Sequence, residues 1–165
     1  AHNFWYDGAN GICGTSAQCN GDGDNIIELA QNNNSEVFRA WQHLSLAGLL
    51  DIQYTGIWNQ EFSVPKAKIS NNFISFGFDI TLSDSNFLRL GGFDNVQGGY
   101  SLRGTLSPNE ARQIDFKSDD GAAISGAILG ANGDNQEAFQ NCLTAGKYAL
   151  NQEQKNCSLL FLLDD

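Results

Sequence analysis

The chain has 165 residues and a formal net charge of −10, from 19 acidic and 9 basic side chains. The acidic surplus argues against a nucleic-acid-binding surface, which needs clustered Lys and Arg, and against an anionic membrane face. A metal cation or a basic partner remains compatible with this charge. The length favours one domain with a real core, so we expect a single domain over residues 1–165.

The four cysteines form two local pairs along the chain, Cys13 with Cys19 and Cys142 with Cys157. There is no C-x-x-C and no histidine cluster that would complete a zinc site. Four cysteines allow three pairings, and the local one costs least in loop closure, so we favour two disulfide-stapled loops. Disulfides indicate an oxidising compartment, which predicts an extracellular or periplasmic protein.

Residues 20–31 carry the alternating oxygen pattern of a calcium loop, with ligands at positions 1, 3, 5, 7, 9 and 12. The sequence differs from that pattern at position 6, where Asn replaces Gly, and at position 12, where Gln replaces Glu. An Asn/Asp/Gly turn without metal is the alternative reading. The predicted Ca²⁺ ligands are Asn20, Asp22, Asp24, Ile26, Glu28 and Gln31.

An amphipathic helix is predicted from residue 35 to about Gly48. Its apolar residues recur at three- and four-residue spacing, which gathers them on one stripe, and a polar residue among 33–35 can cap its start. The predicted buried stripe is Val37, Phe38, Trp41 and Leu44, and the predicted solvent face is Glu36, Arg39, Gln42 and Ser45. A short extended run at 52–55 is expected to follow.

Three strands with short connections are predicted next, and together they indicate an antiparallel meander. Residues 74–82 alternate apolar and polar, which is typical of a strand with one buried face. Residues 83–86 have turn chemistry. The second and third strands are predicted at 87–91 and 100–106, and we expect the first helix to cover the apolar face of this sheet.

The strongest boundary signal is Ser107-Pro108-Asn109-Glu110, a capping box with Pro at the first helical position. It predicts a helix to about Lys117 with Ala111, Ile114 and Phe116 facing inward. We predict a small-residue strand at 123–129, a helical turn at 137–142 and a final buried strand at 159–163.

The sequence contains little that could form a catalytic site. The histidines are His2 near one end and His43 on the predicted helix, and the cysteines are better explained as disulfides than as thiolates. The acidic pairs at 119–120 and 164–165 are interpreted as solvated turns. We therefore predict that the protein is not an enzyme.

Several blocks of this sequence together resemble the pilin-like proteins of type IV pili and type II secretion systems. The resemblance spans most of the chain. The blocks lie at 19–24, 38–44, 47–49, 54–56, 64–69, 106–111 and 114–121, with Cys142 and 157–159 at the end. The most specific are Trp-Gln-His-Leu at 41–44 and Ile-Asp with Asp-Asp-Gly between 114 and 121.

This resemblance implies an α+β pilin-like head, in which an antiparallel sheet packs against a helix and Cys142–Cys157 closes a C-terminal loop. It implies a filament subunit anchored in the inner membrane as a precursor through a preceding hydrophobic helix. Other pilin subunits and the assembly or secretion machinery are the implied partners, and the isolated head is expected to be monomeric. The alternative is a secreted calcium-dependent adhesin or carbohydrate-binding module that uses Trp5, Tyr6 or Trp58 as stacking platforms.

Overall fold

The computed structural model describes residues 21, 23–28, 35–57, 63–69, 72–80, 83–94, 100–133 and 141–163. This part of the chain forms two helices and an antiparallel sheet, an α+β arrangement. The helices are α2 (Glu36–Leu46) and α3 (Pro108–Ser118). The strands are β1 (Phe73–Asp79), β2 (Ser83–Asp94), β3 (Tyr100–Arg103), β4 (Ile128–Asn132) and β7 (Cys157–Leu162), with a separate hairpin of β5 (Leu143–Thr144) and β6 (Lys147–Tyr148).

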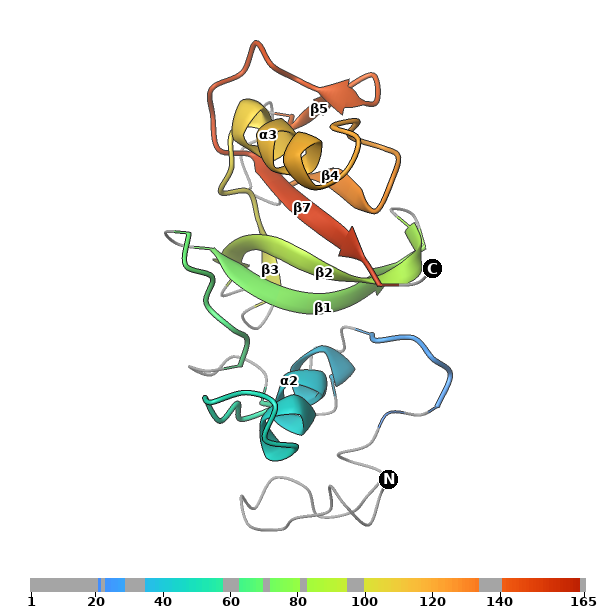
Figure 1. Ribbon diagram of the computed structural model, residues 1–165, viewed down its shortest axis with the longest axis vertical. Helices are drawn as coiled ribbons and strands as arrows, with labels where there is room; N and C mark the ends of the chain where they lie inside the picture. The colour runs from blue at the N-terminus through green and yellow to red at the C-terminus, as the bar shows by residue number, and fades with distance from the viewer. Residues whose placement is uncertain are drawn as a thin grey trace.

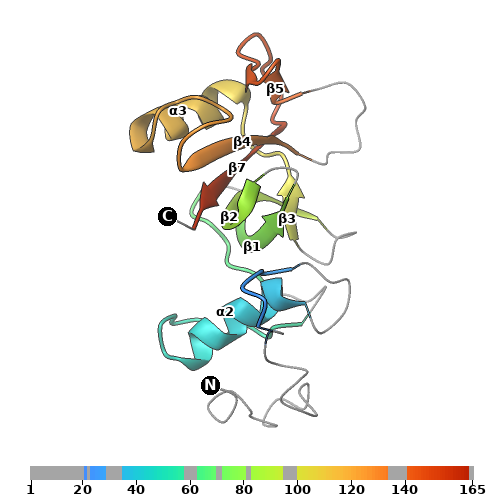
Figure 2. The same cartoon turned by 90° about the vertical axis from the view of Figure 1, so that its right-hand side faces the viewer.

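The main sheet has the order β1-β2-β7-β4, and β3 pairs with the end of β2. The predicted meander of β1, β2 and β3 is confirmed, because both pairings are antiparallel. The last strand, β7, lies inside the sheet between β2 and β4. Figures 1 and 2 show the sheet between the two helices, with α2 beneath β1 and α3 above β4.

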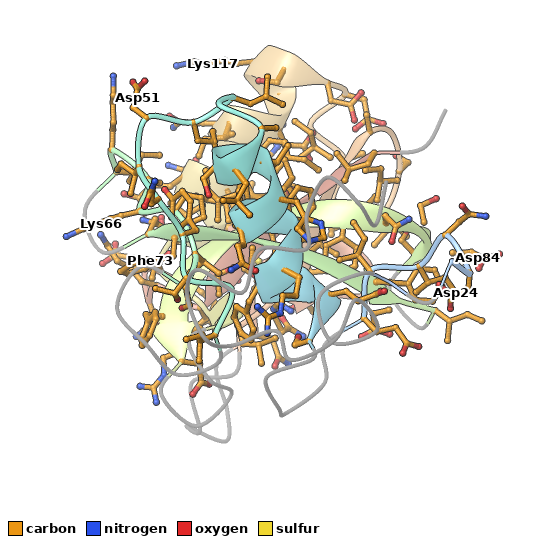
Figure 3. The ribbon with its side chains drawn as sticks, turned by 90° about the horizontal axis from the view of Figure 1, so that it is seen from below. Asp24, Asp51, Lys66, Phe73, Asp84 and Lys117 are labelled. Atoms are coloured by element: carbon orange, nitrogen blue, oxygen red, sulfur yellow. A yellow bond between two sulfur atoms is a disulfide. The ribbon has the colours of Figure 1, made fainter. Side chains whose placement is uncertain are left out.

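The α2 helix packs its predicted apolar stripe against the sheet. Val37 and Phe38 are fully buried, Trp41 is 7% exposed, and Leu44 packs against the same cluster. The Trp41 ring lies 4.5 Å from the Phe76 ring of β1. This stripe of the sequence prediction is confirmed, and Figure 3 shows α2 crossing the strands when seen from below.

The two ends of α2 are formed in different ways. Ser35 holds the N-cap position, but its hydroxyl donates to the Glu28 carbonyl at 3.4 Å and makes no capping bond. At the other end Gly48 adopts φ +71° while Gly48 N–H and Leu49 N–H donate to Ser45 and Leu44 carbonyls. This is a Schellman motif, which needs a left-handed residue that glycine adopts without strain.

The predicted solvent face of α2 is wrong at two positions, because Arg39 and Gln42 are buried. The Arg39 guanidinium donates to Gln42 Oε1 at 2.8 Å. The chain after the helix folds back over this face, and Gly56, at φ +66°, approaches Gln42 so closely that no Cβ fits. The extended run predicted at 52–55 is not part of a strand. Tyr54 within this segment is buried.

The predicted limits of the first two strands are also wrong. β1 ends at Asp79, and Ile80, which was predicted to lie on the buried face, is 73% exposed. The turn predicted at 83–86 is the first part of β2, where Asn86 pairs with Phe78. β2 therefore begins earlier and ends later than residues 87–91.

The single buried face predicted for β1 is wrong as well. Ser75 and Gly77 are buried, whereas Ile74 and Phe76 are only partly buried. The polar face is covered because β3 lies against it, where the hydroxyls of Ser75 and Ser101 contact each other. Arg89 of β2 is buried nearby and donates to Ser158 Oγ at 2.8 Å.

The capping box at the start of α3 is confirmed. Ser107 Oγ accepts from Glu110 N–H at 3.3 Å, and Glu110 Oε2 accepts from Ser107 N–H at 2.8 Å. Ala111 is buried and Ile114 packs against the core, but Phe116 is 66% exposed, contrary to the prediction. In the last turn of α3 the buried side chain is that of Asp115.

The C-terminal third differs from the prediction in the start of one strand and in an additional hairpin. Residues 122–127 form turns, and β4 begins only at Ile128, five residues after the predicted start. The final strand is confirmed as β7, slightly longer than predicted at its start. The predicted helical turn at 137–142 lies almost wholly outside the described residues, and the β5–β6 hairpin that follows was not predicted.

Candidate functional site

The predicted calcium loop is described at residues 21 and 23–28. Gly23 has φ +91° and Asn25 has φ +68°, so the backbone bends sharply at the two positions on either side of Asp24. Asn tolerates this left-handed conformation better than most residues, which fits its place at position 6 of the loop. Asp24 Oδ1 accepts from Ile26 N–H at 2.8 Å, which closes the turn.

Contacts with both α2 and the sheet hold this loop in place. Ile27 packs against the α2 core, and its N–H donates to Asn86 Oδ1 at 2.8 Å. The Asn86 amide in turn donates to the Asn25 carbonyl at 2.7 Å. Glu36 of α2 accepts from Glu28 N–H at 3.4 Å. Figure 3 shows Asp24 and Asp84 on the same side of α2, away from Asp51.

Half of the predicted calcium ligands can be placed. Asp24, Ile26 and Glu28 lie on the described loop, with Asp24 and Glu28 exposed. Asn20, Asp22 and Gln31 lie outside the described residues, as do Cys13 and Cys19. The described backbone bends sharply at Gly23 and Asn25. Calcium binding by this loop stays a prediction.

A second acidic group lies where α3 ends, and we call Asp115, Asp119 and Asp120 the acidic turn. Their carboxylate oxygens lie within 4.8 Å of one another. The sequence analysis interpreted 119–120 as a solvated turn, and it included Asp115 in a block of the resemblance without giving it a role in a site. The spacing could have indicated this group, because Asp115 lies four and five residues before Asp119 and Asp120, which is about one helical turn.

Each carboxylate of the acidic turn accepts hydrogen bonds from the protein. Asp115, fully buried, accepts from Tyr148 O–H at 2.8 Å and Gly121 N–H at 3.0 Å. Asp119 accepts from Ile128 N–H at 3.0 Å. Asp120 accepts from Ala122 N–H and Ser125 O–H, both at 2.7 Å. These bonds account for the turns at 122–127 that displace the start of β4.

The pKa values of two of the carboxyl groups in the acidic turn are shifted in different directions, because their surroundings differ. Burial raises the pKa of Asp115, against the effect of the hydrogen bonds from Tyr148 and Gly121. Hydrogen bonds from Ala122 and Ser125 lower the pKa of Asp120. Burial and the bond to Asp115 raise the pKa of the Tyr148 phenol, which stays protonated as the donor. Through the hydrogen bonds from Ile128 and Tyr148, the acidic turn joins α3 to β4 and β6.

The disulfide Cys142–Cys157 is formed, as predicted, and both residues are fully buried. Cys157 is the first residue of β7, and its backbone pairs with Leu106 just before α3. The bond closes the segment that holds the β5–β6 hairpin onto the sheet. A disulfide is compatible with an extracellular or periplasmic location.

A hollow of about 540 Å³ lies between the 121–124 turn and the 145–150 hairpin. Its charged lining residues within the described part of the chain are Arg112 and Lys147, and we call it the basic hollow. The exposed carboxylate of Asp120 lies at its wall, where it accepts from the N–H of the lining residue Ala122. Ile124 and Leu150 supply apolar surface and are 67% and 50% exposed. The sequence analysis did not identify it, because its walls come from segments that are separate in the sequence.

Comparison with known protein families, curated proteins and solved structures finds no match to this chain. Neither helix in the described part of the chain has the length and hydrophobicity that crossing a membrane requires. The aromatic residues Trp5, Tyr6 and Trp58, on which the binding-module alternative depends, lie outside the described residues.

Proposed function

We propose that this chain is the globular head of a pilin-like subunit, a non-catalytic building block of a type IV pilus or type II secretion filament. The observation that carries the proposal is the buried Cys142–Cys157 disulfide, which fastens a C-terminal loop to a strand inside the sheet. The resemblance implies this arrangement together with a helix packed on an antiparallel sheet.

The blocks that carry the resemblance also occupy constrained positions of the fold. Trp41 lies in the core, Gly56 has positive φ against Gln42, and Asp115 joins α3 to β6 and to the turn at Gly121. Ser107 and Glu110 form the capping box. These roles are structural, which supports a scaffold function because a building block needs rigidity more than reactive groups.

The native protein in its source cell tests this proposal. We expect mass spectrometry of the envelope or sheared-filament fraction to detect this domain with a preceding apolar segment of about 20 residues, the length needed to span a bilayer. An antibody against the domain should label the same fraction. A native protein without such a segment, found only free in the medium, would contradict the proposal.

We also propose that Ca²⁺ binds the 20–31 loop and fastens it to the head. The support is the bent backbone at Gly23 and Asn25 and the oxygen-rich sequence. Because an ion that binds only the folded state raises its stability, Tm should rise with millimolar calcium. Asp24→Asn should reduce that rise.

Asp120→Asn is the matched control, because it changes the acidic turn and leaves the loop intact. If the calcium effect survives Asp24→Asn and disappears in Asp120→Asn, the ion binds the acidic turn and the loop assignment is wrong. No Tm change with calcium in the unsubstituted protein would contradict both sites.

A further inference from the structure

Asn132 and Gly133, at the end of β4, are two neighbours that can react with each other, and we call them the labile pair. An Asn side chain cyclises most readily when Gly follows it, because glycine has no Cβ to keep its backbone nitrogen away from the side-chain carbonyl. The sequence has three Asn-Gly pairs, at 10–11, 20–21 and 132–133, and the structure describes only the last of them completely. Asn132 is exposed, so solvent reaches its side chain.

Glycine is required at the second position of this pair by packing. The backbone of Gly104 lies so close to Gly133 that no Cβ fits there. The fold therefore fixes a glycine at this position, whichever residue precedes it. An Asn before it makes a chemically reactive pair in a place where the second residue cannot be exchanged.

The surrounding hydrogen bonds hold the labile pair in an unreactive geometry. The Gly133 N–H, whose nitrogen would attack, donates to the Asn156 carbonyl at 2.7 Å. The Asn132 side-chain oxygen accepts from Leu143 N–H at 3.2 Å, which fixes the group that would be attacked. Asn132 is also paired with Cys157 of β7 in the antiparallel ladder, so its backbone is extended. Ring closure requires rotation out of that conformation.

Both of these hydrogen-bond partners are direct neighbours of the disulfide in the sequence. Leu143 follows Cys142, and Asn156 precedes Cys157. We propose that the disulfide keeps the labile pair from cyclising, and that loss of the bond makes Asn132 a site of spontaneous deamidation. A chain in which this disulfide is not formed then acquires a permanent chemical change beside it.

The reaction takes place within the chain and needs only water. The Gly133 nitrogen bonds to the side-chain carbonyl carbon of Asn132, the C–N bond of the side-chain amide breaks, and ammonia leaves with the proton from the Gly133 N–H. Water then opens the succinimide ring to aspartate or isoaspartate. Isoaspartate adds a methylene to the backbone, which changes the register of β4 against β7 at this end of the strand.

Peptide mass spectrometry during incubation at mildly alkaline pH tests the inference. It distinguishes Asn from aspartate and isoaspartate at residue 132. In the folded wild type we expect Asn132 to react at least about tenfold more slowly than in urea, because the attack needs local opening of β4. The pair at 10–11, measured in the same digest, is the internal reference for solution conditions.

Replacing both Cys142 and Cys157 by Ala should raise the rate at Asn132 by about tenfold or more without denaturant, while amide hydrogen exchange shows that α2 stays protected. Adding Asn132→Gln to this double variant is the matched control. It should abolish most of the product, because the longer side chain closes its ring more slowly.

Three results would overturn the inference. The first is a folded wild type that deamidates at residue 132 as fast as it does in urea, and the second is a double cysteine variant with the wild-type rate. The third is a double variant in which α2 has also lost its protection, because the release would then come from global unfolding. The proposed function is read from the native cell fraction, so its failure and the failure of this inference are separate outcomes.

Discussion

The two helices of this protein pack against one sheet by different means. α2 contributes large side chains, and its core contains Phe38, Trp41, Tyr54 and Val64. α3 itself contributes Ala111 and Ile114, and the core beneath it also contains Leu106, Ile128, Leu159 and the disulfide, with Asp115 buried beside α3. The α2 region is centred on aromatic side chains, whereas the α3 region adds a covalent bond and directed hydrogen bonds to an aliphatic core.

The difference shows how a helix with few large inward-facing side chains can still be fixed in place. Ala111 buries little area, so α3 gains less from the hydrophobic effect than α2 gains through Phe38 and Trp41. The disulfide and the hydrogen-bonded carboxylates of the acidic turn limit the conformations available to the turns around α3. The five variants below test this division, in order of expected effect.

Trp41→Ala should have the largest effect, because it removes a buried ring from the α2 core. We expect a loss of about 3–5 kcal/mol in the free energy of unfolding, measured by urea denaturation. Trp41→Phe is the matched control: it keeps a ring and removes an indole N–H that has no hydrogen-bond partner among the described residues. If both variants lose the same stability, packing of the ring is not the source.

Replacing both Cys142 and Cys157 by Ala should cost about 3 kcal/mol, the chain-entropy value for a loop of this size. The variant is preferable to chemical reduction because it leaves Cys13 and Cys19 unchanged. Amide hydrogen exchange should show protection lost first in β5, β6 and β7, with α2 retained. Equal loss in α2 would mean that the two regions unfold as one unit.

Asp115→Asn should cost roughly 1–3 kcal/mol, because one of the two donors that face the carboxylate loses its acceptor. The raised pKa of Asp115 means that the folded state binds its proton more tightly than the unfolded state. Its contribution is therefore greatest at acid pH and falls as pH rises through the folded pKa. The stability difference between wild type and variant should shrink as pH rises above the ordinary pKa of an aspartate.

Asp120→Asn should show the opposite pH dependence in the same stability measurement. The lowered pKa of Asp120 means that its contribution is present at neutral pH and is lost as pH falls below the ordinary value. Its stability difference from wild type should therefore grow as pH rises. The same pH trend in both variants would contradict the assigned directions.

Ser107→Ala should have the smallest effect, a loss of about 1 kcal/mol from the missing cap of α3. Ser107→Asp is the control that restores an acceptor for Glu110 N–H. Because Glu110 has a pKa lowered by the Ser107 N–H, its contribution to stability is lost on acidification. Urea denaturation of both variants at about pH 7 would detect the difference, and equal stabilities would show that the cap contributes little.

Local signals predicted the elements that depend on neighbouring residues. The spacing of Val37, Phe38, Trp41 and Leu44 was sufficient for α2, because burial of a helix stripe repeats with the helical turn. The capping box was sufficient for the start of α3, since both of its hydrogen bonds join residues three apart. The antiparallel meander followed from short connections between alternating strands.

The errors share a non-local cause. Arg39 and Gln42 were expected in solvent but are covered by a later segment, and the strand limits near Ile80 shifted because Asn86 pairs with Phe78. Of the candidate site, the sequence indicated Asp24, Ile26 and Glu28 on one loop, but not the Asn86 contacts that hold it. The acidic turn and the basic hollow needed segments that only the fold brings together.

The sequence by itself determined the two helices, the meander and the turns at glycine, because these depend on short-range geometry and spacing. It favoured the local pair Cys142–Cys157 among three possible pairings of the cysteines, and the structure contains that bond. The tertiary structure decided which polar groups are buried, where β4 begins, and that β7 lies inside the sheet. The physical reason is that burial is a property of both surfaces in contact, and one of them is usually distant in the chain.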